Sequence, residues 1–475
     1  MPSGERRVYA IGKRVRETNT YLRNPYIALS LCEPIAVSTV PGMSVQAVRA
    51  LVDENKAEHE KNAARYEGEL AEAYTAMKTC LAWDTIYEPE KQQICSPVSR
   101  LWNINWGGYV LFDWDSYFAA LMFSLDNREL AITNAIAITH EKTESGFIPN
   151  FGSAGDRKSR DRSQPPIGSM VVREIYRRYG DRWLLEGLFD DLLEWNRWFH
   201  KRRQIEDGTL CWGSDPFESR ADSYFELYHV ADLAGAALES GLDNSPMYDD
   251  MGYDEKTHLM TLSDAGLTGL YIMDCEALAD IAKALNKDAE RVELLNRAEE
   301  TKRGIAKLWD EEFGFFLNRR TDTGEFSYRI SPTNFYALMS DRVTPEQARC
   351  CVDEHFYNPE EFWGEFIIPT IARNDPAYPD QEYWRGRIWA PTNFLCYLGL
   401  RKQKLTDACA DMAKKSLALL LKEWRMHGHV HENYNGDDGM GCDVRSSDKF
   451  YHWGGLTGWI ALMEAGVVDD PWQPL

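Results

Sequence analysis

The sequence predicts an all-α protein whose helices pair into hairpins that close into a ring. Roughly eleven or twelve stretches carry the apolar spacing of helices, and most form pairs joined by alternately short and long loops. Strand signals are few and short. The alternation of strands and helices that builds parallel sheets is absent. In such a ring, inner helices line a central cleft and the long loops at one end build the site.

Capping residues mark where several of these helices begin. Ser44 precedes a long amphipathic pattern from Val45 to Lys78. Asp126, followed three residues later by Glu129, forms a capping box ahead of an apolar run. Further helices are expected at 166–178, 183–201, 224–240, 262–286, 289–309, 332–339, 345–354, 388–400, 405–424 and 454–465.

The remaining chain predicts two short strand regions and several long loops. Residues 313–318 and 325–328 are expected to form a hairpin across Thr323-Gly324, and residues 428–431 are expected to form one short strand. Loops at 145–164, 241–253, 365–387 and 427–449 are rich in Gly, Pro, Trp, Asn and Asp, which is typical of functional loops. No low-complexity linker divides the chain. We expect an N-terminal arm of unknown role over residues 1–43 and one large domain over residues 44–475.

Composition excludes several classes of partner. The chain has 475 residues, a net charge of −22 and 44% apolar residues, enough for a packed core. Nucleic acids and anionic membranes both need a basic face, so neither is expected as a partner. No signal-type segment and no run of 18 apolar residues is present, and the ten cysteines form no CxxC pair. We therefore expect a cytoplasmic protein with reduced thiols and no zinc site.

Asp243 is the first candidate catalytic residue. The preceding helical pattern ends at Ser240, and Gly241 suits a left-handed helix C-cap, so Asp243 falls in the loop beyond. A carboxyl group in a loop can serve as a general acid if its surroundings keep it protonated. The alternative is that Asp243 merely caps the next turn, with Ser245 and Pro246 as turn-forming residues.

Glu432 is the second candidate, far downstream in a segment with three histidines. Alternation places His427, His429 and His431 on one side of an extended segment and Glu432 on the other. The histidines are either a weak metal motif or ordinary polar loop residues. Two carboxyl groups such as Asp243 and Glu432 are the minimum for breaking a glycosidic bond, since one donates a proton and the other activates a water or attacks.

Three further patches suit a sugar site. Residues 112–118 join two acids to four aromatic rings, the mixture that sugars need, because carboxylates bind hydroxyl pairs while rings pack on C–H faces. The alternative is a helix start with Asp115 as its cap. Arg162 and Gln164 stand just before a helix that starts at a proline, and residues 384–389 place two cations between tryptophans.

These motifs together resemble the clan that unites trehalases with glycoside hydrolase family 63. The resemblance covers roughly residues 80–465, with all matches in the expected order, and it favours family 63. The compact length is similar to that of the glucosylglycerate and mannosylglycerate hydrolases. The matching segments are 114–118, 162–166, 239–243, 383–386, Ile388-Trp389, Asn393, 431–435 and 451–455.

The resemblance implies an (α/α)6 barrel over residues 44–475 and hydrolysis with inversion at the anomeric carbon. By position, Asp243 takes the general-acid role and Glu432 the general-base role. Trp114, Asp115, Gln164, Trp384 and Arg385 fall where the family binds the sugar in the −1 subsite. The full set of expected substrate-binding residues is Trp114, Asp115, Tyr117, Asn150, Arg162, Gln164, Gly241, Trp384, Arg385, Arg387, Tyr434 and Trp453.

Two departures from the family pattern matter. The second trehalase signature, a Gln-Trp-Asp run followed by a Gly-Trp-Pro stretch, is missing, which disfavours a trehalase. Arg387 stands where many family 63 members have proline. It either faces a substrate carboxylate such as glycerate or makes a structural ion pair.

The sequence thus predicts an inverting α-glycosidase for a small α-glucoside or α-mannoside such as glucosylglycerate or mannosylglycerate, with no cofactor and no metal. The alternatives are an α-glucosidase on short oligosaccharides (kojibiose-like or glucosidase I-like) and a non-catalytic sugar-binding ring. A terpene-cyclase-like ring is disfavoured because no DDxxD-like motif occupies a plausible helix position. The sequence does not predict the oligomeric state.

Overall fold

The computed structural model describes residues 7–16, 26–217, 225–473 and 475. The chain divides into two compact units, Met1–Ala71 and Glu72–Leu475, which we call the N-terminal unit and the helical unit. The expected division of roles, an arm over residues 1–43 and a glycosidase domain from residue 44, stays a prediction.

In its described residues, the N-terminal unit contains a two-stranded ladder, one complete helix and the start of α2 (Glu69–Asp84). Strands β1 (Tyr9–Ile11) and β2 (Ala36–Ser38) pair antiparallel, with Ala10 opposite Val37. Helix α1 (Val45–Ala63) follows, and the Ser44 side chain accepts a hydrogen bond from the Ala47 amide as the sequence predicted. The predicted helix from Val45 to Lys78 is two helices: α1 ends at Ala63, and residues 64–68, which include the left-handed Gly68 (φ +55°), separate it from α2.

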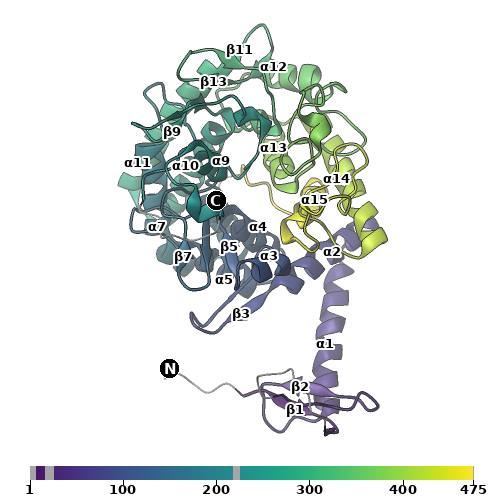
Figure 1. The fold of residues 1–475 in the computed structure, drawn as a ribbon. Coiled ribbons are helices and arrows are strands. Elements are labelled where there is room, and N and C mark those ends of the chain that lie inside the picture. Colours follow the sequence, from purple (N-terminus) through teal and green to yellow (C-terminus); the bar gives the residue numbers. More distant parts are fainter. Residues whose placement is uncertain (1–6, 17–25, 218–224, 474) are drawn as a thin grey trace. The chain divides into compact units, whose positions relative to one another are not determined.

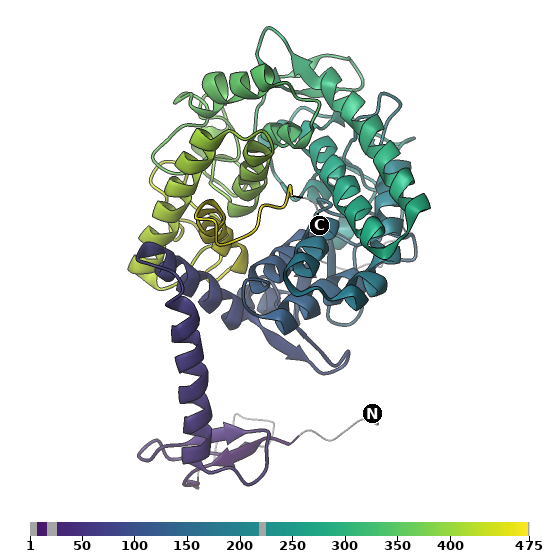
Figure 2. The same ribbon diagram turned by 180° about the vertical axis from the view of Figure 1, so that it is seen from behind.

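The helical unit is an (α/α)6 barrel (Figures 1 and 2). Helical elements that are buried over much of their surface alternate along the chain with elements that keep an exposed face. The outer elements are α2, α5 (Arg128–Thr139), α7 (Arg182–Arg202), α11 (Asp288–Ile305), α12 (Pro345–Cys350) and α14 (Thr406–His427). The inner elements are α4 (Asp113–Phe123), α6 (Gly168–Tyr179), α10 (Ala265–Leu285), η3 (Pro332–Met339), α13 (Ala390–Lys402) and α15 (Leu456–Glu464).

Burial explains this division into inner and outer helices. Every residue of α4 is buried, so it has no polar face and shows no amphipathic period in the sequence. Helix α7, by contrast, buries one stripe of leucine, tryptophan and phenylalanine and exposes the other face. The predicted cap at Asp126 is wrong: the Asn127 side chain accepts the Leu130 amide at 3.0 Å, while Asp126 pairs with Lys78 of α2.

Short helical elements complete the connections. The predicted helix over residues 224–240 is two pieces separated at Asp232, whose side chain caps α9; Tyr224 lies outside the described residues. The predicted helix over residues 332–339 is a 3-10 helix, and α12 continues as a π turn. These elements are α3 (Arg100–Asn105), α8 (Phe225–Tyr228), α9 (Leu233–Ser240), η1 (Pro246–Tyr248), η2 (Ala306–Leu308), η4 (Cys351–Phe356), η5 (Tyr378–Asp380) and η6 (His452–Gly455).

The strands of the helical unit are short and antiparallel. The predicted hairpin across Thr323-Gly324 forms, but between residues 318–320 and 326–327, and residues 315–316 pair instead with residues 309–310. The predicted strand at 428–431 is wrong, because Gly428 is the left-handed C-cap of α14. The strands are β3 (Ile86–Glu88), β4 (Gln93–Cys95), β5 (Val110–Phe112), β6 (Phe151–Ser153), β7 (Arg157–Lys158), β8 (Tyr253–Asp254), β9 (Leu259–Met260), β10 (Leu262–Ser263), β11 (Trp309–Asp310), β12 (Phe315–Phe316), β13 (Asn318–Arg320) and β14 (Phe326–Ser327).

The amino ends of the inner helices gather the residues of interest. Trp114 and Asp115 open α4, Gln164 precedes α6, and Trp453 lies in η6 just before α15. None of the helices in the described ranges is both long and apolar enough to span a bilayer.

Candidate active site

A narrow cavity lies at the amino ends of the inner helices. Aromatic rings and polar side chains that are distant in sequence form its wall. Its free volume is about 30 Å³, which is enough for a water molecule. The lining residues are Trp102, Phe112, Trp114, Asp115, Asn150, Gln164, Leu238, Gly241, Asp243, Tyr383, Trp384, Tyr451 and Trp453.

Asp243 reaches this cavity from the loop after α9. The helix ends at Ser240, and Gly241 is its left-handed C-cap (φ +72°), as the sequence predicted. A Cβ atom on Gly241 would lie 2.7 Å from the Trp114 ring, so the loop passes directly against that indole. The side chain of Ser245, not that of Asp243, caps the following turn by accepting the Met247 amide. Asp243 is one of the residues that line the cavity.

Glu432 is buried beside the same cavity and is held by several hydrogen bonds. Tyr383 donates its hydroxyl to Oε1 at 3.1 Å, and the Asp448 amide donates to Oε2 at 3.1 Å. The Trp453 indole donates to the Glu432 carbonyl at 2.9 Å. Burial, together with the negative charges of Asp448 and Asp115, raises the pKa of Glu432 well above its usual range.

Tyr383 connects the acidic groups of the site. Its hydroxyl contacts Glu432, its side chain lines the cavity beside Asp243, and the charges of Glu432, Asp243 and Asp115 all act on it. Burial is the main cause of the raised pKa of Tyr383. Its backbone adopts φ +56°, an unusual conformation for an aromatic residue that is often found at functional sites. Sequence reasoning did not assign Tyr383 a role, although it lies inside the Tyr-Trp-Arg-Gly motif.

Asp115 is the third carboxyl group at the cavity. Tyr451, a second residue that sequence reasoning missed, donates its hydroxyl to Asp115 at 2.7 Å. Burial raises the pKa of Asp115 to about 8. Asp115 lies inside α4, whose cap position is Phe112, so the alternative of a capping role does not hold.

Aromatic rings form one wall of the cavity. Trp384 stacks on Trp389 with ring centroids 3.6 Å apart, and Trp114 meets Trp453 edge to face at 5.8 Å. Such rings pack against the apolar face of a sugar.

Three buried polar atoms at the cavity have no hydrogen-bond partner among the described residues. They are Gln164 Oε1, Asn150 Oδ1 and the Trp384 indole nitrogen. Buried polar groups in native proteins are almost always paired. Their presence together on the lining of one cavity is consistent with a site for a polyhydroxylated ligand.

Two of the expected substrate-binding residues lie in the core instead of the cavity wall. Tyr117 stacks on Trp195 and shares a hydrogen bond with Thr139. The Tyr434 hydroxyl accepts the His431 amide at 3.0 Å.

The three expected arginines are bound to other protein groups. Arg162 is fully buried, where Nη1 donates to Asp161 and to the His229 carbonyl, both at 2.9 Å. Arg385 bridges Asp249 and Asp380 at 2.8 Å. Arg387 is fully buried and pairs with Asp443 at 2.7 Å, so of the two alternatives for this residue the structure has the ion pair.

The buried carboxylate of Glu239, near the end of α9, connects this helix to Arg203 at the end of α7 and to the loop of Gln164. Glu239 accepts two hydrogen bonds from Arg203, at 2.6 and 2.8 Å, and further bonds from the Ser163 and Gly213 amides at 2.9 and 2.7 Å. Both side chains are completely buried. Sequence reasoning quoted Glu239 only as part of a motif, and nothing in its local sequence identifies Arg203 as its partner.

The histidine segment lies beside Glu423 instead of the cavity. His431 pairs with Glu423 at 3.2 Å, and the rings of His427, His429 and His431 pack on one another. In the described parts of the chain, no group of three or more His, Cys, Asp or Glu side chains has the arrangement of a metal site.

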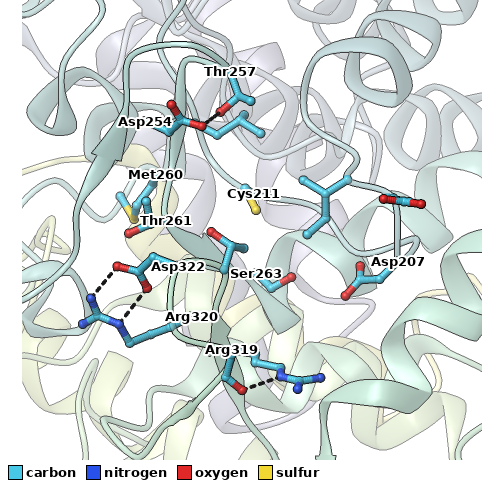
Figure 3. A pocket seen from close by; sticks show the side chains of 15 residues that line it. Asp207, Cys211, Asp254, Thr257, Met260, Thr261, Ser263, Arg319, Arg320 and Asp322 are labelled. Atoms are coloured by element: carbon cyan, nitrogen blue, oxygen red, sulfur yellow. Dashed lines mark hydrogen bonds and ion pairs between the residues drawn. The ribbon is translucent and has the colours of Figure 1, made fainter.

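A larger cavity of about 560 Å³ lies elsewhere, beside β10 and β13 (Figure 3). Its two arginines are bound to protein groups: Arg320 pairs with Asp322 at 2.7 Å, and Arg319 donates to the Gly324 carbonyl. No aromatic side chain lines it. The narrow cavity, with its carboxyl groups and indoles, is the better candidate for sugar chemistry.

Comparisons with known proteins identify the family of this chain. The family model described as mannosylglycerate hydrolase MGH1-like glycoside hydrolase domain matches residues 108–453. Mannosylglycerate hydrolase MGH2 from Selaginella moellendorffii is 22% identical, with 75% of this chain and 81% of the relative aligned. Mannosylglycerate hydrolase from Rubrobacter radiotolerans is also 22% identical, over 64% of this chain and 73% of the relative.

A solved structure shares the fold. The family 63 mannosylglycerate hydrolase from Thermus thermophilus, in complex with glucose, superposes with a TM-score of 0.61 at 19% identity, covering 74% of this chain and 93% of that one. The family match spans most of the helical unit and includes every lining residue of the narrow cavity except Trp102. The chain therefore belongs to the mannosylglycerate hydrolase MGH1-like family of glycoside hydrolases, within glycoside hydrolase family 63.

Proposed function

We propose that this glycoside hydrolase is an inverting α-glycosidase that cleaves a small α-glucoside or α-mannoside, with mannosylglycerate and glucosylglycerate as the leading substrates. One observation carries the assignment of the catalytic pair. Tyr383, which donates its hydroxyl to Glu432, lines the same narrow cavity as Asp243. Two acids 189 positions apart in the chain are thus connected to one cavity, Asp243 as a lining residue and Glu432 through Tyr383.

The proposed reaction uses each acid once. Glu432 takes a proton from a water molecule, and the water oxygen attacks the anomeric carbon of the sugar. As the bond from that carbon to the glycosidic oxygen breaks, Asp243 gives its proton to the departing oxygen. The products are a free sugar of inverted configuration and the released alcohol.

The surroundings of each acid support these roles. Tyr383 and the Asp448 amide hold the two oxygens of Glu432, which fixes the direction in which a water can be activated. The high pKa of Glu432 makes its ionised form a strong base. Asp243 lies in a loop that Gly241 presses against Trp114, which keeps its carboxyl beside the ring that would support the sugar.

The proposal of mannosylglycerate as a leading substrate is supported by the names of the relatives, which specify mannosylglycerate. Free polar atoms on Asn150, Gln164 and Trp384 offer partners for sugar hydroxyls. Since Arg387 is held by Asp443, we propose that this arginine stabilises the site and does not bind a substrate carboxylate.

A hydrolysis screen tests the proposal directly. The purified chain is offered mannosylglycerate, glucosylglycerate, kojibiose, nigerose and trehalose, and release of free sugar is measured. We expect the glycerate glycosides to be cleaved fastest. Preferred cleavage of kojibiose would assign the site to short oligosaccharides, and no cleavage of any of them would contradict the proposal.

Substitution of the acids tests the mechanism. Asp243→Asn and Glu432→Gln should each lower kcat by about 10²–10⁴-fold with folding retained, because each removes one proton transfer. Asp250→Asn, at an exposed site seven residues after Asp243, is the matched control and should keep full activity. Proton NMR of freshly released sugar should show the β-anomer first. Initial α-anomer would contradict inversion.

A further inference from the structure

A tight turn over residues 382–385, which we call the Tyr383 turn, presents two side chains to the narrow cavity. Glu382 and Arg385 exchange both of their backbone hydrogen bonds, at 3.2 and 3.0 Å. Between them, Tyr383 and Trp384 line the cavity. The left-handed backbone of Tyr383 (φ +56°) is unfavourable for an aromatic residue and persists only where the surroundings hold it. The contacts that hold this turn therefore decide where its side chains lie.

Asn244, the residue directly after Asp243, binds the Tyr383 turn through its side chain. Its Oδ1 accepts the Trp384 amide at 2.9 Å, and its Nδ2 donates to the Glu382 carbonyl at 3.4 Å. A primary amide can make both bonds because it carries an acceptor and two donors in one plane. The backbone carbonyl of Asn244 accepts a further hydrogen bond from Arg385 Nη1 at 3.3 Å. The residue next to the proposed acid is thus fastened to the turn at three points.

The Tyr383 turn is also held on its other side, without Asn244. The Trp389 indole donates to the Tyr383 carbonyl at 2.9 Å, and the Trp384 ring stacks on Trp389 with centroids 3.6 Å apart. The Tyr383 hydroxyl donates to Glu432, whose second carboxylate oxygen is held by a backbone amide. The turn and the proposed base therefore form one braced unit, to which the side chain of Asn244 connects the loop of the acid.

Arg385 makes a second connection between the same two segments. Its Nη1 and Nη2 donate to the two carboxylate oxygens of Asp249 at 2.8 and 3.1 Å. Asp249 directly follows η1 in the loop of Asp243. Both side chains of this pair are partly exposed, at 23% and 37%, and ion pairs that water reaches contribute less than buried ones. We therefore expect Asn244 to be the main fastening of the loop.

We infer that Asn244 is a positioning residue that sets the distance between the general acid Asp243 and the general base Glu432, an inference that rests on the proposed function. An inverting pair needs a separation of about 6.5–9.5 Å, so that a water fits beside the sugar. A displacement of about 1 Å can lower the rate by about 10²-fold. In this role Asn244 transfers no proton. Because the Tyr383 turn is braced independently, loss of the Asn244 amide should displace the acid more than the base.

Two substrates with different leaving groups test this role. The glycoside that the parent cleaves fastest releases an alcohol, whose oxygen needs a proton from the acid. The α-fluoride of the same sugar releases fluoride ion when water attacks and the C–F bond breaks, which needs the base but no acid. Asn244→Ala should lower kcat by about 10- to 100-fold on the glycoside and by less than about 3-fold on the fluoride.

Variants of the two acids calibrate these measurements. Asp243→Asn should slow the glycoside and spare the fluoride, whereas Glu432→Gln should slow both. Asn358→Ala is the matched control. This half-buried asparagine accepts the Glu360 amide at 3.0 Å in a loop that does not line the cavity, so its variant should behave like the parent on both substrates.

Arg385→Met removes only the second connection and leaves the Asn244 side chain in place. It should show the same selective loss at a smaller size, which checks the inference even if Asn244→Ala does not fold. Parent-like rates, or equal losses on both substrates, would overturn the positioning role while the selective loss in Asp243→Asn still supports the catalytic pair. Full activity of Asp243→Asn on the glycoside would overturn the proposed function and this inference with it.

Discussion

Glu432 shares its surroundings with other acids, and this determines how the enzyme should respond to pH. The Asp448 amide contacts its carboxylate, Asp448 and Asp115 place negative charge nearby, and two phenols, Tyr383 and Tyr451, complete the group. Because burial and these charges raise the pKa of Glu432, its ionised form increases as the pH rises. Activity that depends on Glu432 as a base should rise with pH across the same range.

Asp448→Asn tests this electrostatic coupling. Removal of the negative charge lowers the pKa of Glu432, so the acid limb of the profile of kcat/KM against pH should move to lower pH. The amide that contacts Glu432 belongs to the backbone and is retained. Asp190→Asn, at an exposed aspartate paired with Lys287, is the control and should leave the profile unchanged. A profile of Asp448→Asn that matches the parent would show that this charge does not act on the base.

Asp84 is a second buried acid with consequences for stability. Both of its carboxylate oxygens have no hydrogen-bond partner among the described residues, and burial raises its pKa from 3.8 to about 9. In the unfolded chain the Asp84 carboxyl ionises at lower pH. At pH values between 3.8 and about 9, folding is therefore accompanied by the uptake of a proton at Asp84. Stability contributed by this group is complete below pH 3.8 and is lost as pH rises towards 9, by about 1.4 kcal/mol for each pH unit.

Asp84→Asn should remove this pH dependence. The stability of the variant relative to the parent should increase steadily from pH 4 to pH 9, as measured by urea unfolding. Asp190→Asn should show no such trend, because its carboxyl is exposed. Parallel stability curves for the parent and Asp84→Asn would mean that Asp84 is ionised in the folded chain.

Helix termini position the site at the scale of secondary structure. The end of α9, the start of α4 and the turn η6 before α15 each bring one or two side chains to the cavity. At the end of α9, Gly241 forms a left-handed turn that passes directly against the Trp114 ring. The turn is permitted because glycine has no Cβ atom.

Gly241→Ala should therefore affect both stability and activity. The left-handed conformation costs alanine about 1–2 kcal/mol, and its Cβ would displace Trp114, so we expect a roughly 10- to 100-fold loss of kcat/KM. Gly180→Ala is a matched control: Gly180 is the C-cap of α6 with φ +71° and has no atom within 4 Å of the added Cβ. It should lose similar stability but keep its activity. Equal activity of the two variants would argue against a tight contact at Trp114.

At the scale of the whole molecule, the two units differ in how much they bury. Helix α10 buries 17 of its 21 residues, whereas α1 buries none of its 19. Apolar burial is the main source of protection against local opening. The free energy of unfolding should thus come from residues 72–475.

Hydrogen exchange should resolve this difference. Amides of α1 should exchange much faster than those of α10, which should exchange only through global unfolding. Equal protection of α1 and α10 would contradict the assignment of stability to the helical unit.

Much of the architecture and part of the site follow from local sequence. The periods of the outer helices, the left-handed cap at Gly241 and the loop position of Asp243 are local properties of spacing and of glycine, and the structure confirms them. The sequence also assigned Trp114, Asp115, Asn150, Gln164, Gly241, Trp384 and Trp453 to one site, and all seven line the cavity with Asp243.

Other features depend on partners that are distant in the chain. Tyr117 shares a motif with Asp115 but lies two residues further along α4, about 200° around the helix, so it points into the core. Arg387 pairs with an aspartate 56 residues away, and Glu239 with an arginine 36 residues away. Tyr383 and Tyr451 belong to the site only because the ring closes and brings their hydroxyls to Glu432 and Asp115.

By itself, the sequence determined the ring of helical hairpins and the family resemblance and proposed two candidate acids, because helix periodicity, caps and short motifs are local signals. The tertiary structure alone decided which charged side chains lie at the cavity and which are bound to one another. The physical reason is that burial and pairing, which set the charge state and direction of a side chain, depend on neighbours that only the closed fold supplies.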